Sequence, residues 1–255
     1  MKKLGLALSG GAVRGVFHLG VLRALDELSL PIHIISGTSS GAIVGALYRD
    51  GKSPEQIMDV VRSASILKMV RPKIWKQGLF SLNYLRELLK ANLISQTIEE
   101  LPSKLLITAT NLNTARLDVF STGPLVESVV ASSSVPVMFE PITLGQYLYT
   151  DGGLLMNLPA APLLGRCDVI IGVNLVPLTP LEDLTSFPRL AGRIFDISVS
   201  RNIQSQLALC DFVISSDEMQ SHGRFSFEGI ERLYDLGYKA TMDQSKDIQE
   251  RMKDA

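Results

Sequence analysis

The sequence predicts an α/β fold built on a parallel sheet, and the first fifty residues supply the evidence. A short apolar strand is expected at 4–8, followed by a segment at 16–28 whose leucines recur at helical spacing. A second apolar strand at 32–35 leads through a turn at 36–40 into another helix. Strands that alternate with helices in this way are typical of parallel strands joined by right-handed crossovers.

The remainder of the chain continues this alternation. Apolar segments predict further strands at 105–110, 117–120, 169–175 and 212–214. Helical spacing predicts helices at 54–63, 82–90, 124–132, 190–209 and 228–253. No repeat, low-complexity tract or linker interrupts the 255 residues, so we expect a single domain over 1–255.

The composition narrows the class of protein. Hydrophobic residues make up 46% and charged residues 20%, as in an ordinary globular protein, and a net charge of −1 argues against a nucleic-acid partner. Two cysteines are too few for a disulfide framework. The apolar run near the N-terminus is too short for a signal peptide, and none is long enough for a membrane span. We therefore expect a cytoplasmic protein.

Gly37-Thr38-Ser39-Ser40-Gly41 fits the G-x-S-x-G pattern of a nucleophile elbow. The pattern lies between a predicted strand and a predicted helix, which is the context in which it carries chemistry. Glycine is needed at both flanks because a side chain there would collide with the neighbouring strand or helix. The interpretation without chemistry is a glycine-rich turn, but the flanking elements favour a serine hydrolase.

A second glycine-rich loop, Ser9 to Gly15, lies at the first strand-to-helix junction. Successive amides at a helix N-terminus form an anion site that suits a phosphate or a developing oxyanion. A nucleotide site is excluded, because no Gly-Lys-Ser/Thr follows and Ala12 stands where a dinucleotide fingerprint has glycine. Together with the serine elbow, the loop predicts an oxyanion hole.

The base that would activate Ser39 is not settled by the residues alone. Asp151 precedes two glycines, a pattern that by itself predicts only a β-turn. His18 and His33 fall in predicted regular elements, where histidine is more often a packing residue. His222 lies in a polar loop and leaves open a Ser39, Asp151, His222 triad, although α/β-hydrolase nucleophiles normally follow more strands than Ser39 does.

Several segments, in the same order, resemble the patatin-like phospholipase family, particularly its short bacterial members. The matching segments are 10–15 (Gly-Gly-Ala-Val-Arg-Gly), 37–41, 131–136, 139–141, 151–153 (Asp-Gly-Gly), 157–159 and 236–238. They span nearly the whole chain. The resemblance implies a three-layer α/β/α fold with a mainly parallel central sheet, and an enzyme that hydrolyses lipid acyl esters without a metal or cofactor.

The resemblance also implies roles for individual residues. Ser39 and Asp151 would form a catalytic dyad that proceeds through an acyl-enzyme. The oxyanion hole would be formed by Gly10, Gly11 and Ala12, with Arg14 adding positive potential. The supporting motif glycines would be Gly37, Gly41, Gly152 and Gly153. The family usually has glycine where this chain has Ala12, and a positive φ there would cost alanine about 1 kcal/mol.

The segment at 62–86 predicts contact with a membrane. It has no acidic residue but contains six basic ones and the single tryptophan, Trp75. Basic and apolar side chains together suit an anionic lipid surface, so the segment is a candidate lid or membrane-docking flap, while an ordinary solvated helix pair is the alternative. The expected partner is a phospholipid or another acyl ester. A non-catalytic lipid-binding module of the same fold is the second alternative, and the sequence does not predict the oligomeric state.

Overall fold

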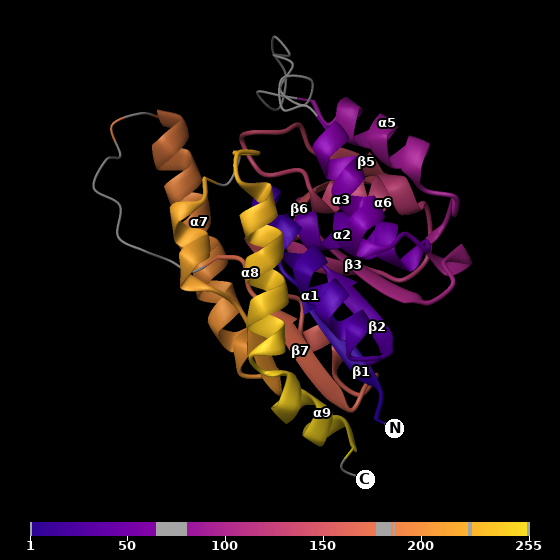
Figure 1. Cartoon of the computed structure of the whole chain (residues 1–255). Coiled ribbons are helices and arrows are strands. Elements are labelled where there is room, and N and C mark those ends of the chain that lie inside the picture. The colour runs from indigo at the N-terminus through magenta and orange to yellow at the C-terminus, as the bar shows by residue number, and fades with distance from the viewer. Residues whose placement is uncertain (1, 65–80, 177–184, 186, 224–225, 254–255) are drawn as a thin grey trace.

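The computed structural model describes residues 2–64, 81–176, 185, 187–223 and 226–253, and within these residues an eight-stranded sheet forms the centre of the protein (Figure 1). The strands are β1 (Leu4–Leu8), β2 (Ile32–Gly37), β3 (Lys104–Asn111), β4 (Arg116–Phe120), β5 (Ile142–Leu144), β6 (Tyr147–Asp151), β7 (Val169–Val173) and β8 (Phe212–Ile214). Hydrogen-bonded neighbours follow the path β5-β6-β3-β2-β1-β7-β8, and β4 also pairs with β3. The buried strands are rich in leucine, isoleucine and valine, as parallel strands covered on both faces require.

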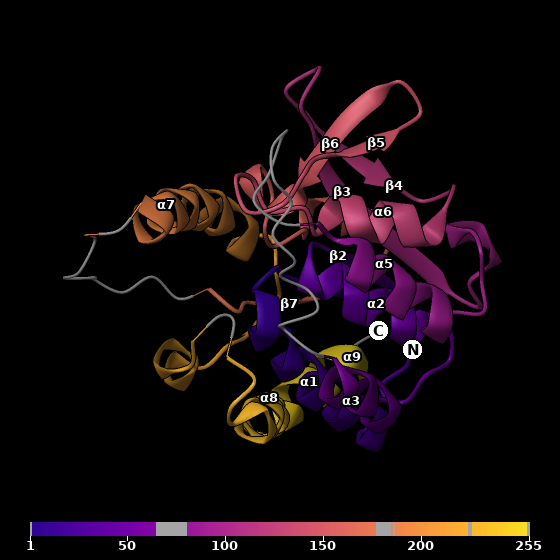
Figure 2. The same cartoon turned by 90° about the horizontal axis from the view of Figure 1, so that it is seen from above.

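Helices cover both faces of this sheet. They are α1 (Val16–Glu27), α2 (Ser40–Arg49), α3 (Pro54–Ser63), α5 (Asn83–Asn92), α6 (Leu125–Ser132), α7 (Phe187–Leu207), α8 (Ile230–Met242) and α9 (Ser245–Lys253). The chain steps from β1 to β2 to β3 in one direction, whereas β7 and β8 step in the other. Right-handed crossovers therefore put α1 and α2 on one face and α7 on the opposite face, as Figure 2 shows. The predicted three-layer α/β/α fold is confirmed.

The sheet is parallel in its centre and antiparallel at one end. β1 pairs in parallel with β2 and β7, and β2 pairs in parallel with β3. β4 and β6 are antiparallel to β3, and β5 is antiparallel to β6. The sequence did not predict the hairpin of β5 and β6, because both strands are short and neither has a continuous apolar run. The hairpin turns at Gly145, whose φ of +60° suits glycine.

One expected helix is divided in two. The sequence predicted a continuous helix over 228–253, but α8 ends at Met242 and α9 begins at Ser245. Between them, the side-chain amide of Gln244 donates a hydrogen bond to the Val213 carbonyl in β8 at 3.1 Å. This bond connects the turn between α8 and α9 to the edge strand of the sheet. None of the described helices is both long enough and apolar enough to cross a membrane. Of the basic segment 62–86, residues 65–80 lie outside the described part of the chain.

Two glycines let α1 and α8 pack with their backbones in contact. A Cβ atom on Gly20 would come within 1.9 Å of the Tyr234 carbonyl oxygen, and one on Gly237 would come within 2.1 Å of the Phe17 carbonyl oxygen. Both distances are far below a van der Waals contact, and the clashing atoms belong to the backbone. Glycine is thus required here for close approach, and the contact holds α8 against α1, the helix that follows the glycine loop.

We predict that Gly237→Ala destabilises the protein by about 2–3 kcal/mol, because its methyl group must push α1 and α8 apart. Helix propensity alone would give the opposite sign, about 1 kcal/mol of stabilisation. Urea unfolding measures the difference. Asp235→Ala, on the exposed side of the same helix, is the matched control and should stay within about 0.5 kcal/mol of the wild type. Equal stability of the wild type and Gly237→Ala would contradict this packing.

Candidate active site

Strand β3 brings the two predicted reactive residues together. Gly37, at the end of β2, pairs with Ile107, whereas Asp151, at the end of β6, pairs with Ala109. β4 pairs with one side of β3, so β2 and β6 both lie along its other side. Because β2 is parallel and β6 antiparallel to β3, the carboxyl ends of these two strands face each other. Only Thr108 separates their pairing positions on β3. The antiparallel hairpin that the sequence did not predict therefore delivers Asp151 to the serine elbow.

Ser39 lies at the tip of a strained turn between β2 and α2. Its φ of +54° and ψ of −120° are unusual for a residue with a side chain, and they are expected of a nucleophile elbow. A Cβ on Gly37 would lie 2.6 Å from the Gly41 carbonyl oxygen, and one on Gly41 would lie 2.1 Å from the Leu8 carbonyl oxygen. Both flanking glycines are thus required by the close approach of α2 to the sheet. The Ser39 amide donates to the hydroxyl of Ser132 at 2.9 Å, which fixes the turn.

Asp151 is 2% exposed, and its carboxyl group interacts with the Ser39 side chain. The Gly153 amide donates to Asp151 Oδ1 at 2.7 Å. Burial raises the pKa of Asp151 to about 6, although the hydrogen bonds from Gly153 and Ser39 lower it in part. Gly152 must be glycine, since a Cβ there would lie 2.5 Å from the Thr108 carbonyl oxygen. A carboxylate with this pKa is a stronger base than an exposed aspartate, yet it is still ionised near neutral pH.

The glycine loop passes directly beside the serine. A Cβ on Gly10 would come within 3.0 Å of the Ser39 Cβ. The Gly10 amide itself donates to the Asn157 carbonyl at 3.2 Å, so it is engaged within the protein. Ala12 has a φ of +54° and begins a short 3-10 helix, Ala12–Gly15, which leads into α1. The first amides of a helix have no acceptor within it, and the amides at the start of this helix are therefore suited to an oxyanion.

Arg14, His18 and His222 each have a main-chain carbonyl as a hydrogen-bond partner. The Arg14 guanidinium donates two hydrogen bonds, at 3.0 and 2.8 Å, to the main-chain carbonyl of His222. The His222 ring nitrogen Nε2 is 2.8 Å from the Ser226 carbonyl. His18 is fully buried, its Nε2 lies 2.8 Å from the Ser9 carbonyl, and burial lowers its pKa to about 4. The neutral imidazole of His18 thus supports the start of the glycine loop.

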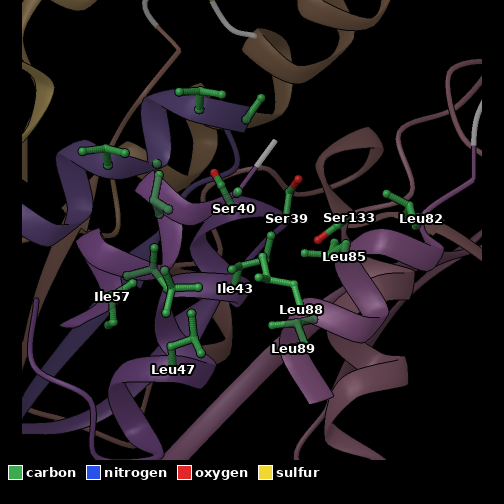
Figure 3. A pocket seen from close by; sticks show the side chains of 18 of the residues that line it. Ser39, Ser40, Ile43, Leu47, Ile57, Leu82, Leu85, Leu88, Leu89 and Ser133 are labelled. Carbon is green, nitrogen blue, oxygen red and sulfur yellow. The ribbon is translucent and has the colours of Figure 1, made fainter. Parts of the chain in front are cut away.

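An apolar cavity of about 230 Å³ extends from Ser39 into the layer of helices. Figure 3 shows Ser39, Ser40 and Ser133 near one end of it and Leu47 and Ile57 toward the other. Its walls come from the start of α1, from α2, α3 and α5, and from the loop after α6. Almost all of the lining side chains are aliphatic or aromatic, which suits a hydrocarbon chain rather than a polar ligand. Within the described residues no cluster of three potential metal ligands is found.

Some residues of the site were missed by the sequence analysis. Ser132 lies within a segment that carried the family resemblance, but no role followed from it. Thr38 and Thr108 bring their hydroxyl groups to 2.6 Å from each other beneath the elbow. Asn202, in α7, bonds to the turn after Asp151. The available signal for Asn202 was an amide side chain beside the apolar stripe of an amphipathic helix, which does not reveal its partners.

The family model for patatin-like phospholipases matches residues 6–164 of the chain, which include the glycine loop, the serine elbow and the aspartate turn. The chain belongs to this family. An uncharacterised NTE family protein of Mycobacterium tuberculosis is 30% identical over 215 residues, which are 79% of this chain and 60% of that protein. The chain thus spans less than two thirds of that relative. A lysophospholipase NTE1 of Coccidioides immitis is 29% identical and matches 93% of this chain but only 17% of its own length.

Two solved structures share the fold. VipD from Legionella pneumophila superimposes with a TM-score of 0.59 at 16% identity, over 96% of this chain and 67% of VipD. Human GIVD cytosolic phospholipase A2 gives a TM-score of 0.57 at 13% identity, over 98% of this chain and 59% of the human protein. At such low identities the likeness extends to the architecture alone.

We predict that Asp151→Asn stabilises the folded protein increasingly as the pH rises. The pKa of Asp151 is raised on folding, so the stability that it contributes is complete below its unfolded pKa and is lost as the pH rises through about 6. The variant should therefore gain up to about 3 kcal/mol over the wild type near pH 8 and little near pH 4. Urea unfolding across this range measures the gain. A gain that does not change with pH would contradict a buried, ionising carboxylate.

Proposed function

We propose that the protein is a lipid acyl hydrolase in which Ser39 is the nucleophile and Asp151 its general base. The single observation that carries the proposal is the buried carboxyl group of Asp151, which has a pKa of about 6 and interacts with the Ser39 side chain. A serine hydroxyl needs a base to attack an ester, and the base is most effective when its pKa is close to the working pH. Membership of the patatin-like phospholipase family supports the same chemistry.

The reaction follows from these positions in two halves. Asp151 accepts the Ser39 proton as the serine oxygen attacks the ester carbonyl. The tetrahedral oxyanion is stabilised by amides at the start of the 3-10 helix, those of Ala12 and its neighbours, and by the first amide of α2, that of Ser40. Asp151 then returns the proton to the departing alcohol, which leaves an acyl group on Ser39. Water hydrolyses this acyl-enzyme through the same base and releases a carboxylic acid.

The cavity next to Ser39 supports a long-chain acyl group as the part of the substrate that is recognised. Its lining is almost wholly apolar, and burial of each methylene is worth about 0.8 kcal/mol. The family description and the lysophospholipase relatives support phospholipids and lysophospholipids as the class of acyl donor. The human phospholipase of similar fold was crystallised in complex with an alkenyl fluorophosphonate, a reagent that is therefore a suitable probe here.

A triad with His222 and a non-catalytic lipid-binding module are the alternatives. The triad is less well supported, since the Asp151 carboxyl group interacts with the Ser39 side chain, whereas the described ring contact of His222 is to the Ser226 carbonyl. The non-catalytic alternative is supported only by the replacement of a family glycine by Ala12. The alanine nevertheless adopts the left-handed backbone that the loop needs, with a φ of +54°.

Labelling by an alkyl fluorophosphonate tests these possibilities together. We expect the wild type to be labelled at Ser39 and Ser39→Ala not to be labelled. Asp151→Asn should slow labelling by about 100-fold or more, because its amide cannot accept the serine proton, whereas His222→Ala should keep the rate within about threefold. Intact-mass kinetics and peptide mapping provide the measurement. An unlabelled wild type would favour the lipid-binding module, and loss of labelling in His222→Ala would favour the triad.

We further propose that the basic segment at 62–86 contacts an anionic membrane surface. Arg62 and Arg86, which flank the part outside the described residues, already have carboxylate partners in Glu231 and Glu127, respectively. The charge available for lipid headgroups therefore rests mainly on Lys68, Arg71, Lys73 and Lys76. A location in the cytoplasm remains a prediction.

Replacement of Lys68, Lys73 and Lys76 by glutamate should weaken pelleting with phosphatidylserine-rich vesicles by about 100-fold, at about 1 kcal/mol per lysine. The matched control changes Lys104, Lys239 and Lys246, which are exposed on other elements, to glutamate. The control carries the same net charge but should pellet as the wild type does. Equal loss in both triple variants would mean that net charge, and not this segment, governs binding.

A further inference from the structure

Helix α7 lies on the opposite face of the sheet from the helices that line the acyl cavity (Figure 2). One of its side chains, that of Asn202, nevertheless reaches the reactive loops. Asn202 Oδ1 accepts a hydrogen bond from the main-chain amide of Asn157 at 2.8 Å, and Asn202 Nδ2 donates one to the main-chain carbonyl of Gly153 at 2.9 Å. Gly153 is also the residue whose amide donates to the Asp151 carboxylate. A single amide side chain thus holds the turn that orients the proposed base.

Asn157 carries this constraint on to the glycine loop. Its Nδ2 donates to the Gly10 carbonyl at 3.1 Å, and its own carbonyl accepts from the Gly10 amide at 3.2 Å. The Asn157 side chain is wedged between two glycines. A Cβ on Gly10 would lie 2.6 Å from its Oδ1, and a Cβ on Gly153 would lie 2.7 Å from the same atom. The glycine loop and the aspartate turn are therefore spaced by Asn157, whose backbone is anchored by Asn202.

We propose that Asn202 is a positioning residue that fixes the glycine loop relative to the Ser39–Asp151 pair. The proposal rests on the proposed function, since it assigns to α7 the task of aligning the oxyanion donors with the base. The bond pattern needs both a donor and an acceptor, and an amide provides both. Aspartate is nearly isosteric but cannot donate to the Gly153 carbonyl, and it would place a second negative charge near Asp151. Alanine removes both hydrogen bonds.

Gln206 provides a matched control on the same helix. It lies one turn after Asn202, is 8% exposed, and accepts a hydrogen bond from the Ala161 amide at 2.9 Å. Gln206→Ala therefore also removes a buried hydrogen bond between α7 and the loop beneath it, but at a point that does not touch the aspartate turn or the glycine loop. It separates a general loosening of α7 from the loss of a specific constraint.

The test uses steady-state hydrolysis of a soluble short-chain p-nitrophenyl ester by folded protein, with thermal midpoints measured for each variant. We expect Asn202→Ala to lower kcat by about 10- to 100-fold with KM changed by less than about threefold, because misplaced groups lose transition-state stabilisation. Asn202→Asp should in addition move the acid limb of the pH–rate profile to higher pH, since a nearby negative charge raises the pKa of Asp151. Gln206→Ala should leave both kcat and the position of the acid limb unchanged.

Two results would overturn the proposal. The first is unchanged kcat in folded Asn202→Ala, and the second is equal loss of kcat in Asn202→Ala and Gln206→Ala with no shift of the acid limb in Asn202→Asp. Failure of the proposed function is distinguishable from both, because in that case the wild type itself would neither hydrolyse the ester nor be labelled at Ser39 by the fluorophosphonate.

Discussion

The interaction between the Ser39 side chain and the buried carboxylate of Asp151 is the one on which the rest of the site depends. A carboxylate in this position is costly, because burial disfavours its charge and raises its pKa to about 6. The serine is also held in a strained backbone conformation, with a φ of +54°. Both features persist because the surrounding elements leave little freedom: β3 sets the separation of the two strand ends, and glycines at 37, 41 and 152 let backbones approach closely.

The geometry divides the protein into a part that positions the proposed dyad of Ser39 and Asp151 and a part that contains the proposed acyl site. One face of the sheet, with α1, α2, α3 and α5, encloses the apolar cavity. On the opposite face, α7 anchors the turn after Asp151 and, through Asn157, the glycine loop. Ser39, the proposed nucleophile, lies where the two parts meet, at the carboxyl end of β2, which is where open α/β sheets usually bind their ligands.

The sequence predicted much of this arrangement because its main signals are local. The strands at 4–8 and 32–35, the glycine-rich turns, and the elbow at Ser39 each depend on a few consecutive residues, and the structure has these elements where they were expected. Asp151 could be singled out only through the family resemblance, since Asp-Gly-Gly alone predicts a β-turn. The remaining features are long-range. The hairpin of β5 and β6 consists of short strands without an apolar run, and the contacts of Asn202 and Arg14 join residues 45 and 208 positions apart.

The most direct test of this account is the titration of the Asp151 carboxyl group, followed by carbon-13 NMR in the wild type and in Ser39→Ala. We predict a pKa near 6 in the wild type and a higher pKa in Ser39→Ala, because burial remains while the hydrogen bond that lowers the pKa is lost. A pKa near the ordinary aspartate value, or one that does not change when the Ser39 hydroxyl is removed, would contradict the Ser39–Asp151 pair as the centre of the site.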